Sequence, residues 1–537
     1  MPERNVVNPI LRGFNPDPSI CRVDDDFYIA TSTFEWYPGV RIHHSRDLRH
    51  WQLVTRALDN ERLLNMLGEP DSCGVWAPCL SWSDGRFWLA YTDVRRFDGN
   101  FKDTHNYLTT ATDIGGPWSD PVYLNSSGFD PSLFHAGDGR KWFLNMVWDH
   151  RPNRSFFNGI VMQEYDAERH CLAGEPTRIF SGTELGYTEG PHLYRIGEFY
   201  YLLTAEGGTG YGHAMTVARS RALHGPYEPD PAGPLVTTRE RPDWPLQRTG
   251  HGDIVQLKDG SRFVVFLASR RCGESRHSPM GRETVLQPLD LTADGWLRLP
   301  HGDALPRVEI AAPDLPAFDV PPCIERDDFD EPALDIVYQW LRTPWPEQFH
   351  SLTERPGHLR LYGMESPGSW YTQALIARRQ THEVFVAETL LESDPADFQQ
   401  MAGLILYYNA SKFHYLYVSR DDTIGKYIGI MSCLADSSLA ATFPIEDARV
   451  PLADARAVGL RMVVCHERLR FEWSAGGGES ADWNTIPAEL DVRVLTDQAG
   501  RTDGEQFTGT FVGLCAHDVS GRRAFADFDY FLVRPGN

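Results

Sequence analysis

One short sequence pattern occurs five times in the first half of this 537-residue chain, and it restricts the fold more than any other feature. The copies begin with NPDPSI at Asn15, WAPCL at Trp76, FDPSLF at Phe129, EGPHLY at Glu189 and HGDIV at His251. Each copy leads into a turn and a second apolar stretch, such as SDGRFWLAYT or IGEFYYLLTAE. Recurrence at roughly 55–60 residues with strands alone is typical of a β-propeller rather than of a helical solenoid.

The copies also predict which side chains meet. When the prolines of the first four copies are superposed, one position is shared by Asp17, Ala77, Asp130, Gly190 and, in the fifth copy, His251. Glu189 precedes this position by one residue, so it must leave from a differently shaped start of the strand or from a loop, because a one-residue offset turns a side chain to the other face. Since propeller blades converge on an axis, we expect Asp17, Asp130 and Glu189 to approach one another, with His251 nearby.

An alternative is that each Asp-Pro step is only turn chemistry, in which Asp accepts a backbone hydrogen bond and Pro begins a strand. Three carboxylates in repeat register favour a functional site instead. A fold needs no acid at the axis of a propeller, and a buried acid is costly unless it is paired or used.

Composition limits the class of ligand and predicts the compartment. The chain has 51 basic and 74 acidic residues, a formal charge of −23, which argues against nucleic acid and against an anionic membrane surface as partners. The nine cysteines lack framework or zinc-ribbon spacing and are expected to be mostly buried, reduced thiols. Because the first residues show no signal segment and no stretch approaches a membrane span, we expect a cytoplasmic protein.

The chain is longer than one hydrophobic core normally supports, and its pattern changes near residues 304–325. That segment is rich in proline and poor in periodicity, as in a linker. Residues 326–537 carry alternating runs such as HLRLYG and AGLILYYN, separated by turns at about 8–12 residues. We therefore expect an all-β protein with a propeller over residues 1–303 and a β-sandwich over residues 326–537.

Nine segments, in order along nearly the whole chain, resemble the glycoside hydrolase family 43 β-xylosidases of the subgroup with a C-terminal β-sandwich. They are NPILRGFNPDPSI, TSTFEWYPGVRIHHSRDL, GVWAPCLSW, GFDPSLF, NMVWD, YTEGPHLY, QRTGHGDIV, GRET and EQFTGTFVGL. The resemblance implies a five-bladed propeller with its pocket on the axis, a concanavalin-like second domain, and inversion at the anomeric carbon. It also implies that Asp17 is the general base, Glu189 the general acid, and Asp130 the carboxylate that tunes the acid and orients the sugar.

The chemistry agrees with these roles. An inverting glycosidase needs a protonated carboxyl group to donate to the leaving oxygen and an ionised carboxylate to activate water, about 6.5–9.5 Å apart. Opposite blades can supply that gap. A third carboxylate beside the acid disfavours loss of its proton, a role suited to Asp130.

Further residues are expected to bind the substrate. By the resemblance, the aromatic residues that line the xylose subsite and the pocket mouth are Phe34, Trp76, Phe129, Trp148 and, from the second domain, Phe507. Each aromatic residue is alternatively part of a core. Arg282, in GRET, is expected to bind sugar hydroxyls or a carboxylate, or else to form a structural salt bridge. Thr209 is expected to contact a sugar hydroxyl, or else to fill a turn.

His251 has competing interpretations. In the resembling family a histidine at this place contacts the substrate region or lies beside a water-coordinated Ca²⁺ on the propeller axis, and the alternative is a hydrogen-bonded channel histidine. A hard cation needs six or more oxygen ligands, and no contiguous loop provides them. The chemistry requires no cofactor, and Ca²⁺ near His251 is left open.

These features predict an exo-acting, inverting β-D-xylosidase that acts on xylobiose and short β-1,4-xylo-oligosaccharides. The alternatives are an α-L-arabinofuranosidase, an enzyme with both activities, and a noncatalytic carbohydrate-binding propeller, since a fold alone does not establish function. The acid, base and tuning set argues against the last. A homo-oligomer is left open.

Overall fold

The computed structural model describes residues 5–434, 441–445, 449–452, 455–477, 481–499 and 506–536. The described chain is almost entirely β, with two single-turn 3-10 helices, η1 (Pro346–Gln348) and η2 (Val492–Val494). It forms two compact units. Unit 1 comprises Met1–Leu64, Ser72–Arg270 and Arg282–Pro321, and unit 2 comprises Asn65–Asp71, Arg271–Gly281 and Pro322–Asn537.

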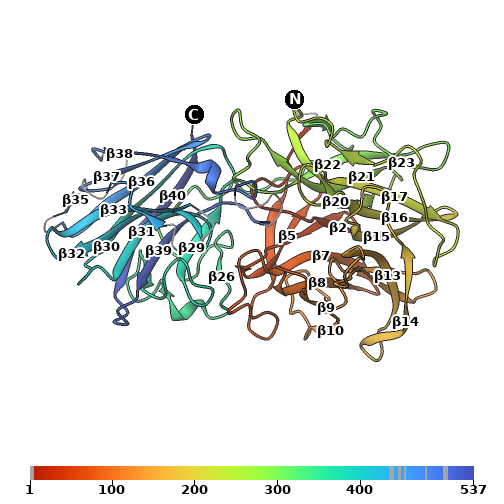
Figure 1. The fold of residues 1–537 in the computed structure, drawn as a ribbon, viewed down its shortest axis with the longest axis horizontal. Helices are drawn as coiled ribbons and strands as arrows, with labels where there is room; N and C mark the ends of the chain where they lie inside the picture. The colour runs from red at the N-terminus through yellow and green to blue at the C-terminus, as the bar shows by residue number, and fades with distance from the viewer. Residues whose placement is uncertain are drawn as a thin grey trace. The chain divides into compact units, whose positions relative to one another are not determined.

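Unit 1 is a five-bladed β-propeller, as predicted, and each blade is an antiparallel sheet (Figure 1). The first two blades are β2 (Ser19–Val23), β3 (Asp26–Thr31), β5 (Gly39–Ser45), β6 (Gln52–Leu58), and β7 (Gly74–Ser83), β8 (Arg86–Arg96), β9 (Asp103–Ala111), β10 (Val122–Asn125). The third is β11 (Ser132–His135), β12 (Lys141–Trp148), β13 (Phe157–Asp166), β14 (Cys171–Phe180). The fourth is β15 (Glu189–Ile196), β16 (Phe199–Glu206), β17 (Ala214–Ser220), β18 (Glu228–Pro229), with β19 (Val236–Thr237) also on β17. The fifth is β20 (Leu246–Gln256), β21 (Arg262–Arg270), β22 (Glu283–Leu291), β23 (Leu297–Arg298).

The first strands of the five blades contact one another in a closed ring. β2 lies beside β7 and β20, and β11 and β15 complete the circle between them. Each repeated sequence copy is therefore the innermost strand of a blade. The remaining described strands of unit 1 are β1 (Asn5–Val7), which pairs with β24 (Glu309–Ala311), and β4 (Trp36–Tyr37).

Turn residues and apolar alternation explain the blades. The β7–β8 hairpin turns at Asp84 and Gly85, with φ of 54° and 70°, and a two-residue turn of this kind needs positive φ at both places. Apolar residues of adjacent blades pack between the sheets. Ile20 and Ile29 of the first blade form one cluster with Val255 and Val265 of the fifth.

Unit 2 is a β-sandwich of two antiparallel sheets, also as predicted. One sheet runs β27 (His350–Ser351), β28 (Leu359–Tyr362), β40 (Phe525–Pro535), β30 (Val384–Ser393), β36 (Ala457–Cys465), β37 (Arg468–Ser474), β38 (Asn484–Asp491), with β25 (Arg326–Asp327) on β40. The other runs β29 (Ala374–Arg379), β39 (Phe511–Asp518), β31 (Gln400–Asn409), β32 (Lys412–Asp421), β33 (Gly425–Leu434), β34 (Ala441–Thr442), with β35 (Val450–Pro451) on β33. A short strand, β26 (Trp340–Leu341), precedes η1. Contacts of β30 with β31 and of β28 with β39 show that the sheets pack as two layers.

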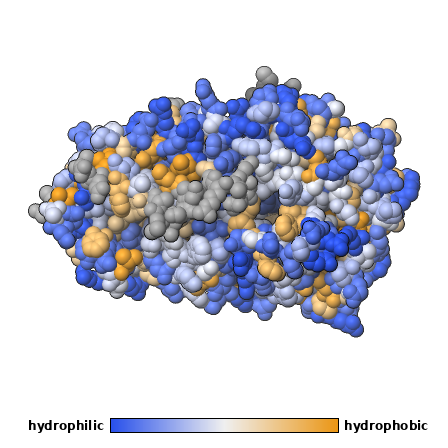
Figure 2. Space-filling view, viewed as in Figure 1, coloured by the Kyte–Doolittle hydropathy of each residue, from blue (hydrophilic) through white to orange (hydrophobic). Residues whose placement is uncertain are grey.

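The surface is consistent with the composition. On the face drawn in Figure 2, hydrophilic side chains predominate and apolar ones are scattered between them. Among the described residues, no helix has the length and apolar character that crossing a bilayer would require.

Candidate active site

The five positions that the sequence places in register share an unusual backbone conformation. Their φ values are 52° at Asp17, 40° at Ala77, 56° at Asp130, 57° at Gly190 and 43° at His251. This left-handed region costs an L-residue roughly 1–2 kcal/mol, and such strain is characteristic of functional sites. The same local geometry, within the innermost strand or just before it, therefore presents a side chain from four of the five blades.

A β-bulge accounts for the one-residue offset of Glu189. In β15, Glu189 pairs with Ala205 and His192 pairs with Leu203, so the register shifts between them. Comparable shifts occur in β7 between Trp76 and Cys79. A bulge re-aims the residues beside it. This is the differently shaped start of the strand that the sequence required for Glu189.

Asp17 is surrounded by hydrogen-bond donors. Its side chain is buried, and its Oδ2 accepts a hydrogen bond of 2.6 Å from Ser32 Oγ. Its Oδ1 lies 3.2 Å from Nη1 of Arg282, which is also buried. Ser32 Oγ in turn accepts from the backbone N of Ala77 at 2.7 Å. A carboxylate that is held by these donors is well placed to accept a proton.

Asp130 has a different environment. Its Oδ2 accepts from the backbone N of Gly190 at 3.0 Å. Burial, followed by the charge of Asp17, raises the pKa of Asp130 to about 8. His251 lies between the two acids, with Nδ1 3.7 Å from Asp17 Oδ1 and 3.9 Å from Asp130 Oδ2. Burial lowers the pKa of His251 to about 4, so the ring is neutral at physiological pH.

Glu189 is the carboxyl group best suited to hold a proton. It begins β15 and is half-buried. Burial, and then the charges of Asp130 and Asp17, raise the pKa of Glu189 well above its usual range, while Arg282 and Lys102 oppose that shift. Like charges that share a site cannot all ionise, so the set retains a proton near neutral pH.

Arg282 joins several of the predicted residues. Its Nη1 lies 3.4 Å from Thr209 Oγ1 as well as beside Asp17, and its guanidinium carbon lies 5.4 Å from the centre of the Phe34 ring. Arg282, Thr209 and Phe34 are therefore brought together at Asp17. The ion pair with Asp17 is one of the two alternatives that the sequence left open for Arg282.

The four aromatic residues predicted in the propeller form a continuous row. Ring centres are 5.7 Å apart for Phe34 and Trp76, 5.5 Å for Trp76 and Phe129, and 6.4 Å for Phe129 and Trp148. The first three side chains are buried and Trp148 is half-buried. The four rings come from the first three blades, and the first and third of these blades also carry Asp17 and Asp130. Contact of these rings with a sugar stays a prediction.

Comparison with known proteins identifies the family. The profile of "Glycosyl hydrolases family 43" matches residues 6–297, which is more than half of the chain. The chain belongs to glycosyl hydrolase family 43. The profile "Beta xylosidase C-terminal Concanavalin A-like domain" matches residues 326–534 of this family 43 enzyme, so the sandwich of unit 2 is concanavalin A-like.

Similar proteins span the whole length of the family 43 chain. The "Xylosidase/arabinosidase 43B" of Humicola insolens is 49% identical over 99% of this chain and 98% of that protein. The "Beta-xylosidase" of Bacillus subtilis (strain 168) is 45% identical over 98% of this chain and 99% of that protein. The crystal structure of xylan beta-1,4-xylosidase from Bacillus halodurans C-125 aligns with a TM-score of 0.95 at 47% identity, covering 98% of this chain and 100% of that one.

Sequence reasoning did not single out three residues of the family 43 site. Ser32, which bonds to Asp17, lies at the end of the first hairpin. Lys102 lies 4.3 Å from the centre of the Trp148 ring, and burial lowers its pKa to about 8. His213 bonds through Nδ1 to the carbonyl O of Arg248 at 3.1 Å. Ser32 stands within a motif already quoted, whereas Lys102 and His213 have no repeat partners that could have signalled them.

Two predicted features stay predictions. Phe507 is half-buried in unit 2, and residues 504 and 505 of its loop lie outside the described residues. For the ion proposed near His251, the two adjacent carboxylates already bind Ser32, Arg282 and the Gly190 N–H. In the part of the chain that the structure describes, no three His, Cys, Asp or Glu ligand atoms around His251 lie within 4.8 Å of one another. The residues present therefore do not fit a directly coordinated Ca²⁺ there.

Proposed function

We propose that this family 43 enzyme is an exo-acting, inverting β-D-xylosidase that releases xylose from the non-reducing ends of xylobiose and short β-1,4-xylo-oligosaccharides. The observation that carries the proposal is the contrast between two carboxyl groups of one site. Asp17 receives charge-assisted donors, whereas burial and like charges raise the pKa of Glu189. Separated acid and base environments are what glycoside hydrolysis requires.

In this mechanism, Asp17 accepts a proton from a water molecule as that water attacks the anomeric carbon. Glu189 donates its proton to the leaving oxygen as the glycosidic bond breaks, so the configuration inverts in a single displacement. Burial, and then the like charges of Asp130 and Asp17 as they ionise, keep the proton on Glu189, and neutral His251 lies between Asp130 and Asp17. Asp17 then returns its proton to solvent, and Glu189 takes one up.

Glu189→Ala tests the acid. Without a proton donor, turnover of xylobiose should fall by about 10²–10⁴-fold, whereas an aryl xyloside whose leaving group departs unprotonated should be much less affected. Steady-state kinetics on both substrates measures the difference. Equal losses on the two substrates would remove Glu189 from this role.

The configuration of the product tests the other half of the proposal. Nuclear magnetic resonance during early turnover of a β-xyloside should show α-xylose as the first product. β-Xylose as the first product would show retention and would refute the assignment of Asp17 as a base acting through water.

A second candidate is arabinofuranosidase activity, alone or in addition to xylosidase activity. The Humicola insolens relative is named for both activities. The ratio of kcat/KM for a nitrophenyl β-D-xylopyranoside and a nitrophenyl α-L-arabinofuranoside decides between them. Binding of xylobiose with hydrolysis of neither substrate would instead indicate a noncatalytic propeller.

A cytoplasmic location belongs to the same proposal, since short oligosaccharides would be hydrolysed after import. The exposed thiols Cys171, Cys323 and Cys465 are free, which suits a reducing compartment. Cell fractionation with a xylosidase assay tests it. A homo-oligomer stays a prediction, which light scattering of the purified protein can check.

A further inference from the structure

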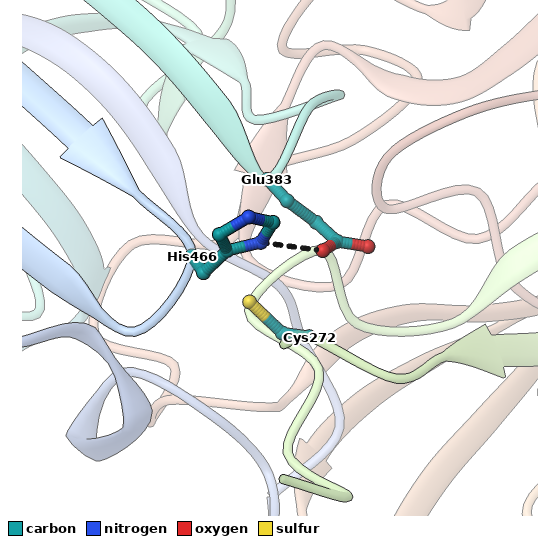
Figure 3. A group of neighbouring side chains, drawn as sticks. All are labelled: Cys272, Glu383 and His466. Atoms are coloured by element: carbon teal, nitrogen blue, oxygen red, sulfur yellow. Dashed lines mark hydrogen bonds and ion pairs between the residues drawn. The ribbon is translucent and has the colours of Figure 1, made fainter. Parts of the chain in front are cut away.

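Three side chains of unit 2 that the proposed hydrolysis does not use bring a thiol, a carboxylate and an imidazole together (Figure 3). The candidate ligand atoms of Cys272, Glu383 and His466 all lie within 4.8 Å of one another. In Figure 3 the sulfur of Cys272 points toward the His466 ring and the Glu383 carboxylate. His466 Nδ1 lies 3.1 Å from Glu383 Oε2.

Backbone contacts hold this cluster in place without an ion. Glu383 directly precedes β30, and His466 lies in the two-residue turn between β36 and β37, whose φ at His466 is 54°. The backbone N of His466 donates to the carbonyl O of Glu383 at 2.9 Å. Cys272 lies in the segment Arg271–Gly281, where its backbone N donates to the carbonyl O of His277 at 3.0 Å. The three ligands are thus placed by the fold.

The geometry points to a zinc site formed by Cys272, Glu383 and His466. Two donors that each lie about 2.1 Å from a tetrahedral zinc ion are about 3.4 Å apart, close to the separation of the Glu383 and His466 atoms. Thiolate and imidazole ligands favour Zn²⁺ over Ca²⁺ or Mg²⁺, which prefer oxygen ligands. The Cys272 thiol gives up its proton to solvent when the ion binds, so affinity increases with pH.

The solvent exposure of the three side chains indicates from which side an ion would reach the site. Cys272 is fully buried, whereas the side chains of Glu383 and His466 are 24% and 51% exposed. The ion therefore reaches the thiolate from the solvent side and keeps a water molecule as its fourth ligand, as three-ligand zinc sites do. It would link the segment Arg271–Gly281 to β30 and to the β36–β37 turn, all within unit 2.

The test measures zinc bound by the full chain. The protein is stripped with a chelator, dialysed against Zn²⁺ and then buffer, and assayed by atomic absorption. The ligand variants are Cys272→Ser, Glu383→Gln and His466→Asn. Asn is chosen because it tolerates positive φ. Matched controls are Cys465→Ser and Glu467→Gln, an exposed thiol and a carboxylate on either side of His466.

We expect the unaltered chain and both controls to bind about one zinc equivalent more than the ligand variants do. Co²⁺ in place of Zn²⁺ should give a thiolate-to-metal absorption band that Cys272→Ser abolishes and Cys465→Ser retains. Zn²⁺ should raise the Tm of the unaltered chain and not that of His466→Asn. Because the proposed mechanism uses none of the three ligands, xylosidase activity should survive in His466→Asn.

Zinc stoichiometry in His466→Asn equal to that of the unaltered chain would overturn the proposal, and so would loss of the bound ion in Cys465→Ser. Cys272 is buried, and its variant can fail to fold for reasons of packing. His466→Asn alters an exposed group and Glu383→Gln a half-buried one, so they keep the test decisive. Since the readouts are bound metal, absorption and Tm, failure here leaves the proposed hydrolysis untouched.

Discussion

At the scale of single residues, the site depends on how three similar carboxyl groups acquire different protonation. The Ser32 hydroxyl group donates a hydrogen bond to Asp17, and the Arg282 guanidinium group forms an ion pair with it. Asp130 receives one backbone N–H, and burial raises its pKa. Burial raises the pKa of Glu189, and the charges of the two other acids raise it further. Chemically equivalent groups thus lie in different electrostatic surroundings, as the proposed division into acid and base requires.

Asp17→Asn should leave the fold and sugar binding nearly intact while lowering kcat by about 10³-fold, because water activation is lost. The amide keeps the shape of the carboxylate, so circular dichroism and xylobiose affinity serve as controls. Added azide should restore turnover with a glycosyl azide of inverted configuration. A retained azide product would contradict the inverting assignment.

At alkaline pH, Asp130→Asn should increase the free energy of unfolding and decrease activity. The pKa of Asp130 is raised from 3.8 to about 8 in the folded state, so folding retains a proton that the unfolded chain releases as pH rises above its own pKa. The stability of the unaltered protein therefore decreases from about pH 4 to pH 8, and a neutral amide removes that decrease. Denaturation at pH 8 should show the variant stabilised by ~2 kcal/mol relative to the unaltered chain, with no such gain at pH 4.

The same variant has a kinetic consequence. Asp130 ionises near pH 8 in the unaltered protein, and its charge then raises the pKa of Glu189; without that charge, the alkaline limb of the activity profile should move to lower pH. An alkaline limb that stays in place would show that Asp130 does not tune the acid.

At the scale of elements, the site is built by one backbone position that recurs in each blade, within the innermost strand or just before it. Left-handed φ recurs at the register position of all five copies, and a bulge in β15 re-aims Glu189. Gly190 shows why one blade lacks a side chain there. A Cβ at Gly190 would lie 3.1 Å from Cδ2 and Nε2 of His251, which is buried between Asp17 and Asp130.

Gly190→Ala should therefore destabilise the protein by ~2–3 kcal/mol, from its positive φ and from displacement of His251, and should lower activity sharply. Gly197→Ala is the matched control, because Gly197 has a φ of 60° in the β15–β16 turn and an added Cβ would meet no atom within 4 Å. Gly197→Ala should cost only ~1–2 kcal/mol and leave kcat unchanged. If both variants behave alike in denaturation and kinetics, contact with His251 is not what requires glycine.

At the scale of the whole molecule, the propeller range is not a self-contained stretch of sequence. Asn65–Asp71 and Arg271–Gly281, which the contiguous range 1–303 includes, cluster with unit 2. Arg342, fully buried, donates from Nε to the carbonyl O of Glu69 at 2.6 Å and from Nη2 to Asp71 Oδ1 at 2.8 Å. The backbone N of Thr510 donates to the carbonyl O of Pro279 at 2.7 Å. Removal of residues 326–537 would take away these contacts with Arg342 and Thr510.

Phe507→Ala tests whether unit 2 also serves catalysis. If the ring contacts the substrate, kcat/KM for xylobiose should fall by an amount equivalent to roughly 1–3 kcal/mol. Phe398→Ala, which alters an exposed phenylalanine of the same unit, is the control and should have no effect. A chain that ends at residue 325 and remains soluble with full activity on xylobiose would show that unit 2 is an independent module.

Much of the fold and the catalytic core could be predicted because the determining features are local and repeated. Asp17, Asp130 and His251 each stand at the same place in the repeated step that leads into an apolar run, with a proline after Asp17 and Asp130 and a glycine after His251. A five-fold repeat places equivalent positions around one axis. The alternating runs after residue 326 likewise predict a second β architecture. Short-range sequence therefore determined the strands, their register and which acids converge.

The tertiary structure determines the hydrogen-bond donors and the burial of those acids, and therefore their chemistry. The donors to Asp17 come from Ser32, just after β3, and from Arg282, just before β22 of the last blade, and burial raises the pKa of Asp130. The cluster of Cys272, Glu383 and His466 could not be predicted from the sequence either, because its members come from three separate segments with no shared motif. Protonation and ligand geometry depend on distances between side chains and on exclusion of water, and these quantities exist only once the chain has folded.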